Sequence, residues 1–345
     1  MRDEHDLGAE RLHAVELRAW GVLGRDDGRV DAELARRPAD ALRHVAGARG
    51  DDVLRTPLVP YGIEKRISLK LECLQPIGSF KLRGALSAVR AASAPELADG
   101  VVTASAGNMA QGVAWAAREV GVSARVICPE GAPRAKLDRV EALGAEVVSV
   151  THEDWWQAML DRRRAGVGGM FIHPVADEAV MAGNGTIGLE LAEDEPELDA
   201  VVIPWGGGGL TTGIASAVKA LRPEVKVVTA EPDTAAPLAA AFAAGGPREI
   251  EFRPSWIDGA GGRALLPGMW ERARELVDEA VAVPLAEVEE ATRLLATRVH
   301  VVAEGAGALA LAVALRRDDR CTCIVSGGNI DASVLARVLA GEAAA

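Results

Sequence analysis

The sequence predicts an α/β protein of two domains, in which twisted, mostly parallel sheets are covered by helices on both faces. Two observations support this fold class. Short apolar runs alternate with stretches of helical periodicity over most of the chain, a pattern typical of parallel strands joined by helices. The length of 345 residues, of which 49% are hydrophobic, is enough for about two buried cores.

The expected elements follow one another in a regular order. Residues 1–50 combine alternating charges with Leu and Ala at helical spacing, which predicts one or two surface helices over a larger core. After them, each apolar run predicts a strand, and the stretch behind it predicts a helix or a Pro- and Ala-rich segment. The runs expected to form strands are 67–74, 100–105, 124–130, 145–150, 200–206, 225–231 and 321–329.

The charge balance excludes several classes of partner. Asp and Glu number 50 against 38 Lys and Arg, so a chain with a net charge of -12 offers no basic stripe for a nucleic acid.

The amino-terminal residues are charged, and no run reaches the ~18 apolar residues that a membrane span needs. Four scattered cysteines fit neither a disulfide framework nor a zinc site, which favours reduced thiols and a cytoplasmic location.

Loops rich in Gly, Ser and Asn follow the apolar runs at four places, 76–81, 105–108, 206–209 and 326–329. A single loop of this kind is explained by a tight turn, because glycine tolerates positive φ. In open parallel sheets, however, ligands bind beyond the carboxyl ends of the strands. Four such loops at equivalent strand ends therefore predict one site assembled from several segments.

The third of these loops consists of four consecutive glycines, Gly206, Gly207, Gly208 and Gly209. It precedes a helical stretch, so its bare backbone amides stand at a helix amino end, where the helix dipole attracts a phosphate. A dinucleotide fingerprint would need a further glycine at Thr211 or Thr212, and no Gly-Lys-Ser/Thr follows for a Walker loop. The alternative is a purely structural turn.

Lys81 is the candidate catalytic residue. It stands in the string SFKLRGA at the expected start of a helix, with Phe80 beside it and Ser79 as a cap. Apolar and glycine neighbours lower the pKa of a lysine amine, as imine formation requires. Taken alone, the position also fits a solvated lysine at a helix start.

Eight strings carry a resemblance to a known family. In order they are SFKLRGA, SAGNMAQG, GNGTIGLE, GGGGL, AEP, DG, EGAGALA and SGGN, and they extend over most of the chain. This order resembles the pyridoxal-phosphate (PLP) enzymes of the tryptophan synthase β-subunit fold, within the branch of threonine/serine dehydratases and serine racemases. The resemblance implies a PLP cofactor, a homo-oligomer, a large PLP-binding domain over 1–97 and 178–345, and a small domain over 98–177.

The resemblance also implies roles for individual residues. Lys81 would hold the cofactor as a Schiff base, and the four glycines would hold its phosphate. Asn108 would bond to the ring 3-oxygen, and Ser326 would face the pyridine nitrogen. A serine there, unlike an aspartate, gives that nitrogen little reason to be protonated, so the ring is a weak electron sink and β-elimination is favoured over transamination.

Further positions are expected around the cofactor and the substrate. Phe80 and Gly259 would lie on opposite faces of the ring, with the acidic Glu304 near the site. The backbone at a helix amino end is suited to a substrate carboxylate. The residues expected to bind it are Ser105, Ala106, Gly107 and Asn108.

The expected reaction is dehydration followed by hydrolytic deamination of a small β-hydroxy amino acid such as L-threonine or L-serine, giving a 2-oxo acid and ammonia. Ala106 stands where the racemase has a serine base for the second face, which favours dehydration over racemisation. Four alternatives remain open. They are another β-substituted substrate such as hydroxyaspartate or phenylserine, β-replacement or racemisation, a PLP-binding protein without catalysis, and a nucleotide-linked oxidoreductase with relaxed glycine motifs at 259–264 and 305–310.

Some positions depart from the branch. Met109 replaces a usual histidine, and Trp205 a small aliphatic residue; we expect both near the pocket, although the tryptophan equally fits core packing. Glu231 and Ala235 match the spacing of a divalent cation site, but Pro237 stands at its aspartate position. A metal requirement therefore stays open.

Overall fold

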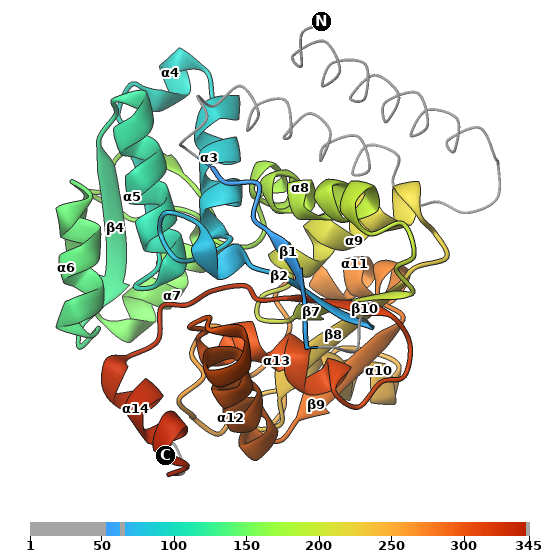
Figure 1. The fold of residues 1–345 in the computed structure, drawn as a ribbon. Helices are drawn as coiled ribbons and strands as arrows, with labels where there is room; N and C mark the ends of the chain where they lie inside the picture. Colours follow the sequence, from blue (N-terminus) through green and yellow to red (C-terminus); the bar gives the residue numbers. More distant parts are fainter. Residues whose placement is uncertain (1–52, 63–65, 343–345) are drawn as a thin grey trace, which may run out of the picture.

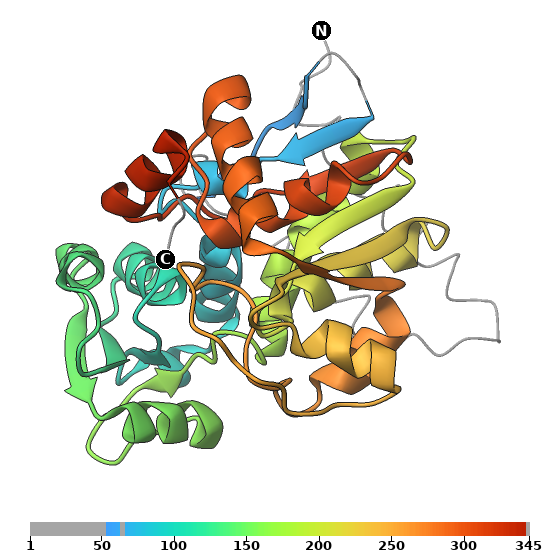
Figure 2. The ribbon, with the colours of Figure 1, turned by 90° about the horizontal axis from the view of Figure 1, so that it is seen from below.

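The computed structural model describes residues 53–62 and 66–342, so the surface helices expected over residues 1–50 lie outside the described residues (Figure 1). Two sheets organise the described part, and Figure 2 shows the smaller one, with its helices, beside the larger one. No helix in these ranges has the length and apolar character needed to cross a bilayer.

The larger sheet has six strands in the order β1-β2-β10-β7-β8-β9. They are β1 (Leu58–Pro60), β2 (Ile67–Lys70), β7 (Ala200–Pro204), β8 (Lys226–Pro232), β9 (Glu279–Val283) and β10 (Cys321–Ile324). Neighbours pair in parallel, except that β1 runs antiparallel to β2 at the edge. Every residue of β7 and β10 is buried, which explains why these strands read as continuous apolar runs.

The smaller sheet has four parallel strands in the order β5-β4-β3-β6. They are β3 (Val101–Ala104), β4 (Ala124–Pro129), β5 (Glu146–Val150) and β6 (Met170–Phe171). The predicted class, an α/β protein with mostly parallel sheets covered by helices, is confirmed. The sequence reasoning missed the three edge strands β1, β6 and β9, which are too short or too exposed to give a long apolar run.

Helices cover the faces of the two sheets (Figures 1 and 2). They are α3 (Lys81–Ala91), α4 (Ala94–Leu97), α5 (Asn108–Val120), α6 (Arg134–Ala142), α7 (His152–Asp161), α8 (Glu178–Asp194), α9 (Gly209–Leu221), α10 (Pro237–Ala244), α11 (Met269–Leu276), α12 (Leu285–Leu294), α13 (Gly305–Ala314) and α14 (Ala332–Ala340). A 3-10 turn, η1 (Glu72–Leu74), follows β2, and a π turn, η2 (Leu295–Val299), follows α12.

Helix α8 lies between α3 and α9 (Figure 1), and small residues allow the close approach on both sides. A Cβ atom at Gly188 would lie 2.7 Å from the carbonyl oxygen of Ile214 in α9, and one at Gly183 would clash with the Arg83 carbonyl in α3. The string GNGTIGLE is therefore a helix-packing surface. Because α3 begins at Lys81 and α9 begins at Gly209, α8 brings two distant site segments together.

A buried network of charges anchors the start of α3. Arg83, 1% exposed, donates to Glu72 at 2.8 Å and to Glu190 of α8 at 2.6 Å. Lys70 of β2 pairs with Glu190 at 2.5 Å and donates to the Thr56 carbonyl. Burial alone would raise the pKa of Glu72, but the charge of Arg83 holds it below its usual value. Two cations and two carboxylates thus balance inside the protein.

This network predicts a large stability difference between two arginines. Arg83→Met removes the ion-pair partner of the buried Glu72 carboxylate and leaves Glu190 with Lys70 alone, and we expect it to lower the free energy of unfolding by about 3–5 kcal/mol. Arg55, which pairs with Glu193 and Asp194 at the surface, is the control, and Arg55→Met should cost about 1 kcal/mol or less. Urea unfolding measures both, and equal losses would contradict the prediction.

Candidate active site

Lys81 is the partly buried first residue of α3, and its amine donates to the carbonyl oxygen of Pro174 at 2.8 Å. It lies 5.1 Å from the centroid of the Phe80 ring. Burial lowers the pKa of Lys81 to about 8, although the nearby Glu304 carboxylate acts in the opposite direction. A large share of this amine is therefore neutral at moderately alkaline pH.

The Pro174 carbonyl is held by a turn that the sequence reasoning missed. Nδ1 of His173 accepts hydrogen bonds from the backbone N–H groups of Val175 at 3.1 Å and Ala176 at 2.9 Å. Burial lowers the pKa of His173 to about 4, so the ring stays neutral and keeps this acceptor. The dipeptide His-Pro shortly before α8 is the only sequence signal for the turn, and it is weak.

The same turn brings Lys81 beside the glycine loop. Val175, the residue after Pro174, packs so closely that a Cβ atom at Gly207 would lie 2.5 Å from its side chain. A Cβ at Gly209 would lie 2.5 Å from the Val175 carbonyl oxygen. The amine and the glycine run, predicted to share one site, are thus joined through two consecutive residues.

The glycine loop fits a phosphate group. Gly208 has φ of +98°, a left-handed conformation that favours glycine, and caps α9 at its amino end. Backbone N–H groups at such a helix start attract anions. Thr211, in the first turn of α9, has a buried hydroxyl with no hydrogen-bond partner among the described residues. An anion cradle made by bare backbone and an unpaired hydroxyl suits the phosphate of the expected cofactor.

The loop after β10 lies against the start of α3. The backbone N–H of Phe80 donates to the Ser326 carbonyl at 3.0 Å, and Ser79 forms a β-bridge with Gly327. Ser326 is 2% exposed. Ser79 accepts only a long hydrogen bond of 3.4 Å from the Lys81 N–H, so it is a marginal cap.

Asn108 and Glu304 meet beside this loop. Nδ2 of Asn108 donates to Oε1 of Glu304 at 2.9 Å. Gly259 is adjacent, because a Cβ atom there would lie 3.5 Å from the same carboxylate oxygen, and its carbonyl lies against Gly206 of the glycine loop. Burial, reinforced by the charge of Asp258, raises the pKa of Glu304 to about 7.

The remaining predicted residues form the loop between β3 and α5. The Ser105 hydroxyl accepts a 3.2 Å hydrogen bond from the Gly107 N–H, and α5 begins at Asn108. Ala106 is partly buried, and the space beside Gly107 is open. The loop thus presents a helix amino end next to the Asn108 side chain.

Two departures from the family pattern are core residues. Met109 is 1% exposed and packs in the hydrophobic core shared by α3 and the smaller sheet. Trp205, also 1% exposed, lies under the glycine loop, where its ring occupies the space beside Gly208. Consecutive side chains on a helix point in different directions, which explains why Asn108 faces the site while Met109 is buried in the core.

The candidate cation ligands already have protein partners. The Glu231 carboxylate accepts from the backbone N–H groups of Leu238 at 3.1 Å and Ala239 at 2.8 Å, and the Ala235 carbonyl accepts from Gly262. Within the described ranges, no three His, Cys, Asp or Glu side chains gather at one point. The Glu231 carboxylate is thus already engaged by two backbone donors.

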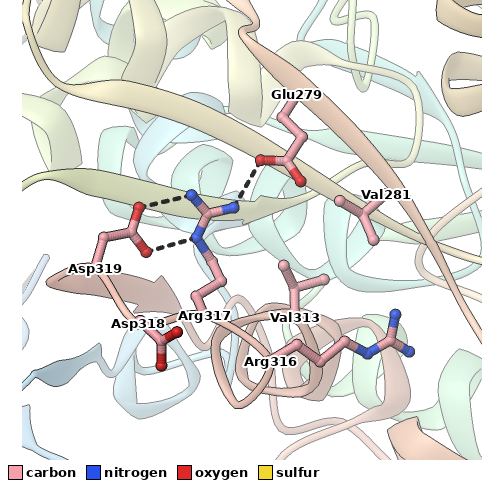
Figure 3. A pocket seen from close by; sticks show the side chains of 7 residues that line it. All are labelled: Glu279, Val281, Val313, Arg316, Arg317, Asp318 and Asp319. Carbon is pink, nitrogen blue, oxygen red and sulfur yellow. Dashed lines mark hydrogen bonds and ion pairs between the residues drawn. The ribbon is translucent and has the colours of Figure 1, made fainter.

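A separate surface pocket of about 400 Å³ lies where β9 begins (Figure 3). Its lining residues are Glu279, Val281, Val313, Arg316, Arg317, Asp318 and Asp319. Arg317 bonds to Asp319 and Glu279 across it. The pocket lies at the amino ends of the strands and contains none of the predicted site residues.

Comparison with known proteins decides the family. The family model "Pyridoxal-phosphate dependent enzyme" matches residues 51–327. The chain belongs to this family. Pyridoxal phosphate is therefore the cofactor of the enzyme, as predicted.

Named relatives narrow the comparison. The enzyme is 39% identical over 279 residues to the L-threonine ammonia-lyase of Thermotoga maritima, covering 79% of this chain and 69% of the relative. Maize serine racemase has a TM-score of 0.81 at 30% identity, covering 89% of this chain and 97% of the other. The processed form of threonine deaminase isoform 2 from Solanum lycopersicum has a TM-score of 0.80 at 30% identity, and the match covers 92% of this chain and 96% of the other.

The pKa of about 8 for Lys81 predicts how cofactor loading depends on pH. Only the neutral amine attacks an aldehyde, so the loading rate of the apoprotein should rise with pH up to about 8 and level off above it. A lysine of ordinary pKa would gain until ~10.4. Stopped-flow absorbance after mixing with pyridoxal phosphate measures the rate. A rate that keeps rising tenfold per pH unit well above the predicted midpoint would contradict the assignment.

Proposed function

We propose that the enzyme eliminates the β-hydroxyl group of a small hydroxy-amino acid of the threonine and serine type, giving a 2-oxo acid and ammonia. The observation that carries the proposal is the Lys81 amine, which is hydrogen-bonded to a neutral carbonyl beside the glycine loop. The names of the relatives, an L-threonine ammonia-lyase and a threonine deaminase, support the reaction class.

The proposed cofactor contacts are those that the resemblance to the family implies for these residues. Lys81 would hold the cofactor covalently, the loop 206–209 would hold its phosphate, and Asn108 would donate to the ring 3-oxygen. Ser326 would face the pyridine nitrogen, and Phe80 and Gly259 would hold the ring from its two faces. When bound, pyridoxal phosphate supplies an electron sink for the bond that breaks at the substrate Cα.

The chain's own groups then carry out binding and proton transfer. Backbone N–H groups at the start of α5, next to Gly107, hold the substrate carboxylate. Lys81 takes the α-proton, since its lowered pKa leaves it partly neutral near physiological pH. The neutral hydroxyl of Ser326 would not protonate the ring nitrogen, which disfavours storage of negative charge on the ring. The β-hydroxyl would then leave as water, with a proton from the cofactor phosphate, as Cα loses its own proton. The enamine product reacts with water to give the 2-oxo acid and ammonia.

We propose that the two sheets mark the domains, with 98–177 as the small domain and 1–97 with 178–345 as the large one. The smaller sheet falls wholly inside the first range, and the larger sheet falls wholly inside the second. A homo-oligomer in the cytoplasm, without a nucleic acid partner, is the proposed working form. The acidic net charge of -12 supports the last point.

Lys81→Ala tests the catalytic assignment. We expect the variant to lose both the visible absorbance band of the bound cofactor and formation of 2-oxo acid from a panel of β-hydroxy amino acids. Lys226→Ala, which changes an exposed lysine at the start of β8, is the matched control and should keep both. Turnover by Lys81→Ala at the wild-type rate would overturn the proposal.

Racemisation is the second candidate, because maize serine racemase is among the similar structures. Ala106 carries no ionisable group, and a positioned base contributes about 10²–10⁴-fold to a proton transfer. Wild-type enzyme should therefore racemise L-serine at least about a hundredfold more slowly than it eliminates water. Ala106→Ser should raise the proportion of D-serine, whereas Ala106→Gly should not. Chiral chromatography decides, and comparable rates of D-serine and 2-oxo acid formation by wild type would favour the racemase.

A further inference from the structure

Asn329, at the end of the loop after β10, has three hydrogen-bonding neighbours that fix its orientation. Its Nδ2 donates to the Ile77 carbonyl oxygen at 2.8 Å and to Oδ1 of Asn108 at 2.8 Å. Its Oδ1 accepts from the Arg139 guanidinium at 2.9 Å. A carbonyl can only accept and a guanidinium can only donate. The Asn329 nitrogen must therefore face Ile77 and Asn108.

The orientation of Asn329 determines that of Asn108. Because Asn329 presents N–H groups, Asn108 must turn its oxygen toward them, which leaves its own nitrogen on the opposite side. There Nδ2 of Asn108 donates to Glu304 at 2.9 Å. A reversed Asn108 would place its nitrogen against the Asn329 nitrogen, and two donors that face each other form no hydrogen bond. The observed orientation is the one that satisfies every partner.

We propose that Asn329 is a positioning residue that keeps the Asn108 nitrogen on the side of Glu304, where its second N–H is directed at the cofactor, with Arg139 supporting Asn329. This inference rests on the proposed function, in which Asn108 contacts the ring 3-oxygen. A donor at that oxygen favours its ionised form, whereas an acceptor favours its protonated form. Asn329 thus controls the ionisation of the cofactor without touching it.

Helix α6, which packs on the smaller sheet, contacts the loop that carries Asn329. Arg139 and Lys136 lie three residues apart on α6 and reach two loops of the larger sheet, since Lys136 pairs with Asp258. Arg139 is exposed, so its hydrogen bond adds little stability. Its effect is on orientation, and we expect Arg139→Met to act in the same direction as changes at Asn329, but more weakly.

Asn329→Asp is the decisive variant. A carboxylate has nearly the same shape but only accepts, so Asn108 should turn its nitrogen toward position 329 and its oxygen toward the cofactor. We expect the protonated form of the ring 3-oxygen to gain about tenfold over the ionised form, roughly the effect of one hydrogen bond. The absorbance spectrum of the resting holoprotein reports both forms, and a role in stability alone would not alter their ratio.

Two variants control for charge and for simple loss of a contact. Ile330→Asp adds the same charge one residue away and should keep the wild-type ratio. Asn329→Leu removes the donor without adding charge and should shift the ratio part of the way.

The outcomes separate this inference from the proposed function. Absence of any cofactor band in the wild type would refute both. Wild-type ratios in Asn329→Asp and Asn329→Leu, with the cofactor bound, would refute only the role of Asn329. Should neither variant fold, the surface variant Arg139→Met decides, and an unshifted ratio there overturns the inference.

Discussion

The hydrogen bond from the Lys81 amine to the Pro174 carbonyl is the interaction on which the site depends. Three other lysines of the described residues pair with carboxylates, namely Lys70 with Glu190, Lys136 with Asp258 and Lys219 with Asp278. A carboxylate stabilises the charged form of an amine. A neutral carbonyl in a buried setting does so far less, and the pKa of Lys81 falls to about 8. Schiff-base formation needs a neutral amine, and the lowered pKa of Lys81 supplies it.

The rest of the fold holds this amine against the glycine loop. Helix α8 packs between α3 and α9, so the residue at the start of one and the loop at the start of the other have fixed relative positions. The buried charges around Arg83 fix the position of the start of α3. They connect α3 to α8 and to the end of β2 only two residues after Lys81. Small residues at the helix contacts and a balanced buried network are therefore part of the catalytic architecture.

Local patterns in the sequence predicted the buried strands, the glycine loop and the residues that identify the family. Buried parallel strands such as β7 give continuous apolar runs, and a glycine run before a helix predicts an anion site without further context. Lys81 and Asn108 stand in strings specific enough to identify the family. Each of these signals lies within a few consecutive residues.

The features that were missed depend on contacts between distant segments. Lys81 and Pro174 are 93 positions apart, and Asn108 and Asn329 are 221 apart. No periodicity or motif reports which carbonyl an amine will meet, or which way a carboxamide will face. The burial of Met109 also could not be predicted from local sequence, because packing in the core decides which face of α5 is buried.

The central claim is that one particular amine among six lysines carries the cofactor. Borohydride reduction of the holoprotein, followed by digestion and mass spectrometry of the peptides, locates the attachment directly. The account predicts a single reduced cofactor on the peptide that contains Lys81. Attachment to another lysine, or no attachment to any, would contradict it.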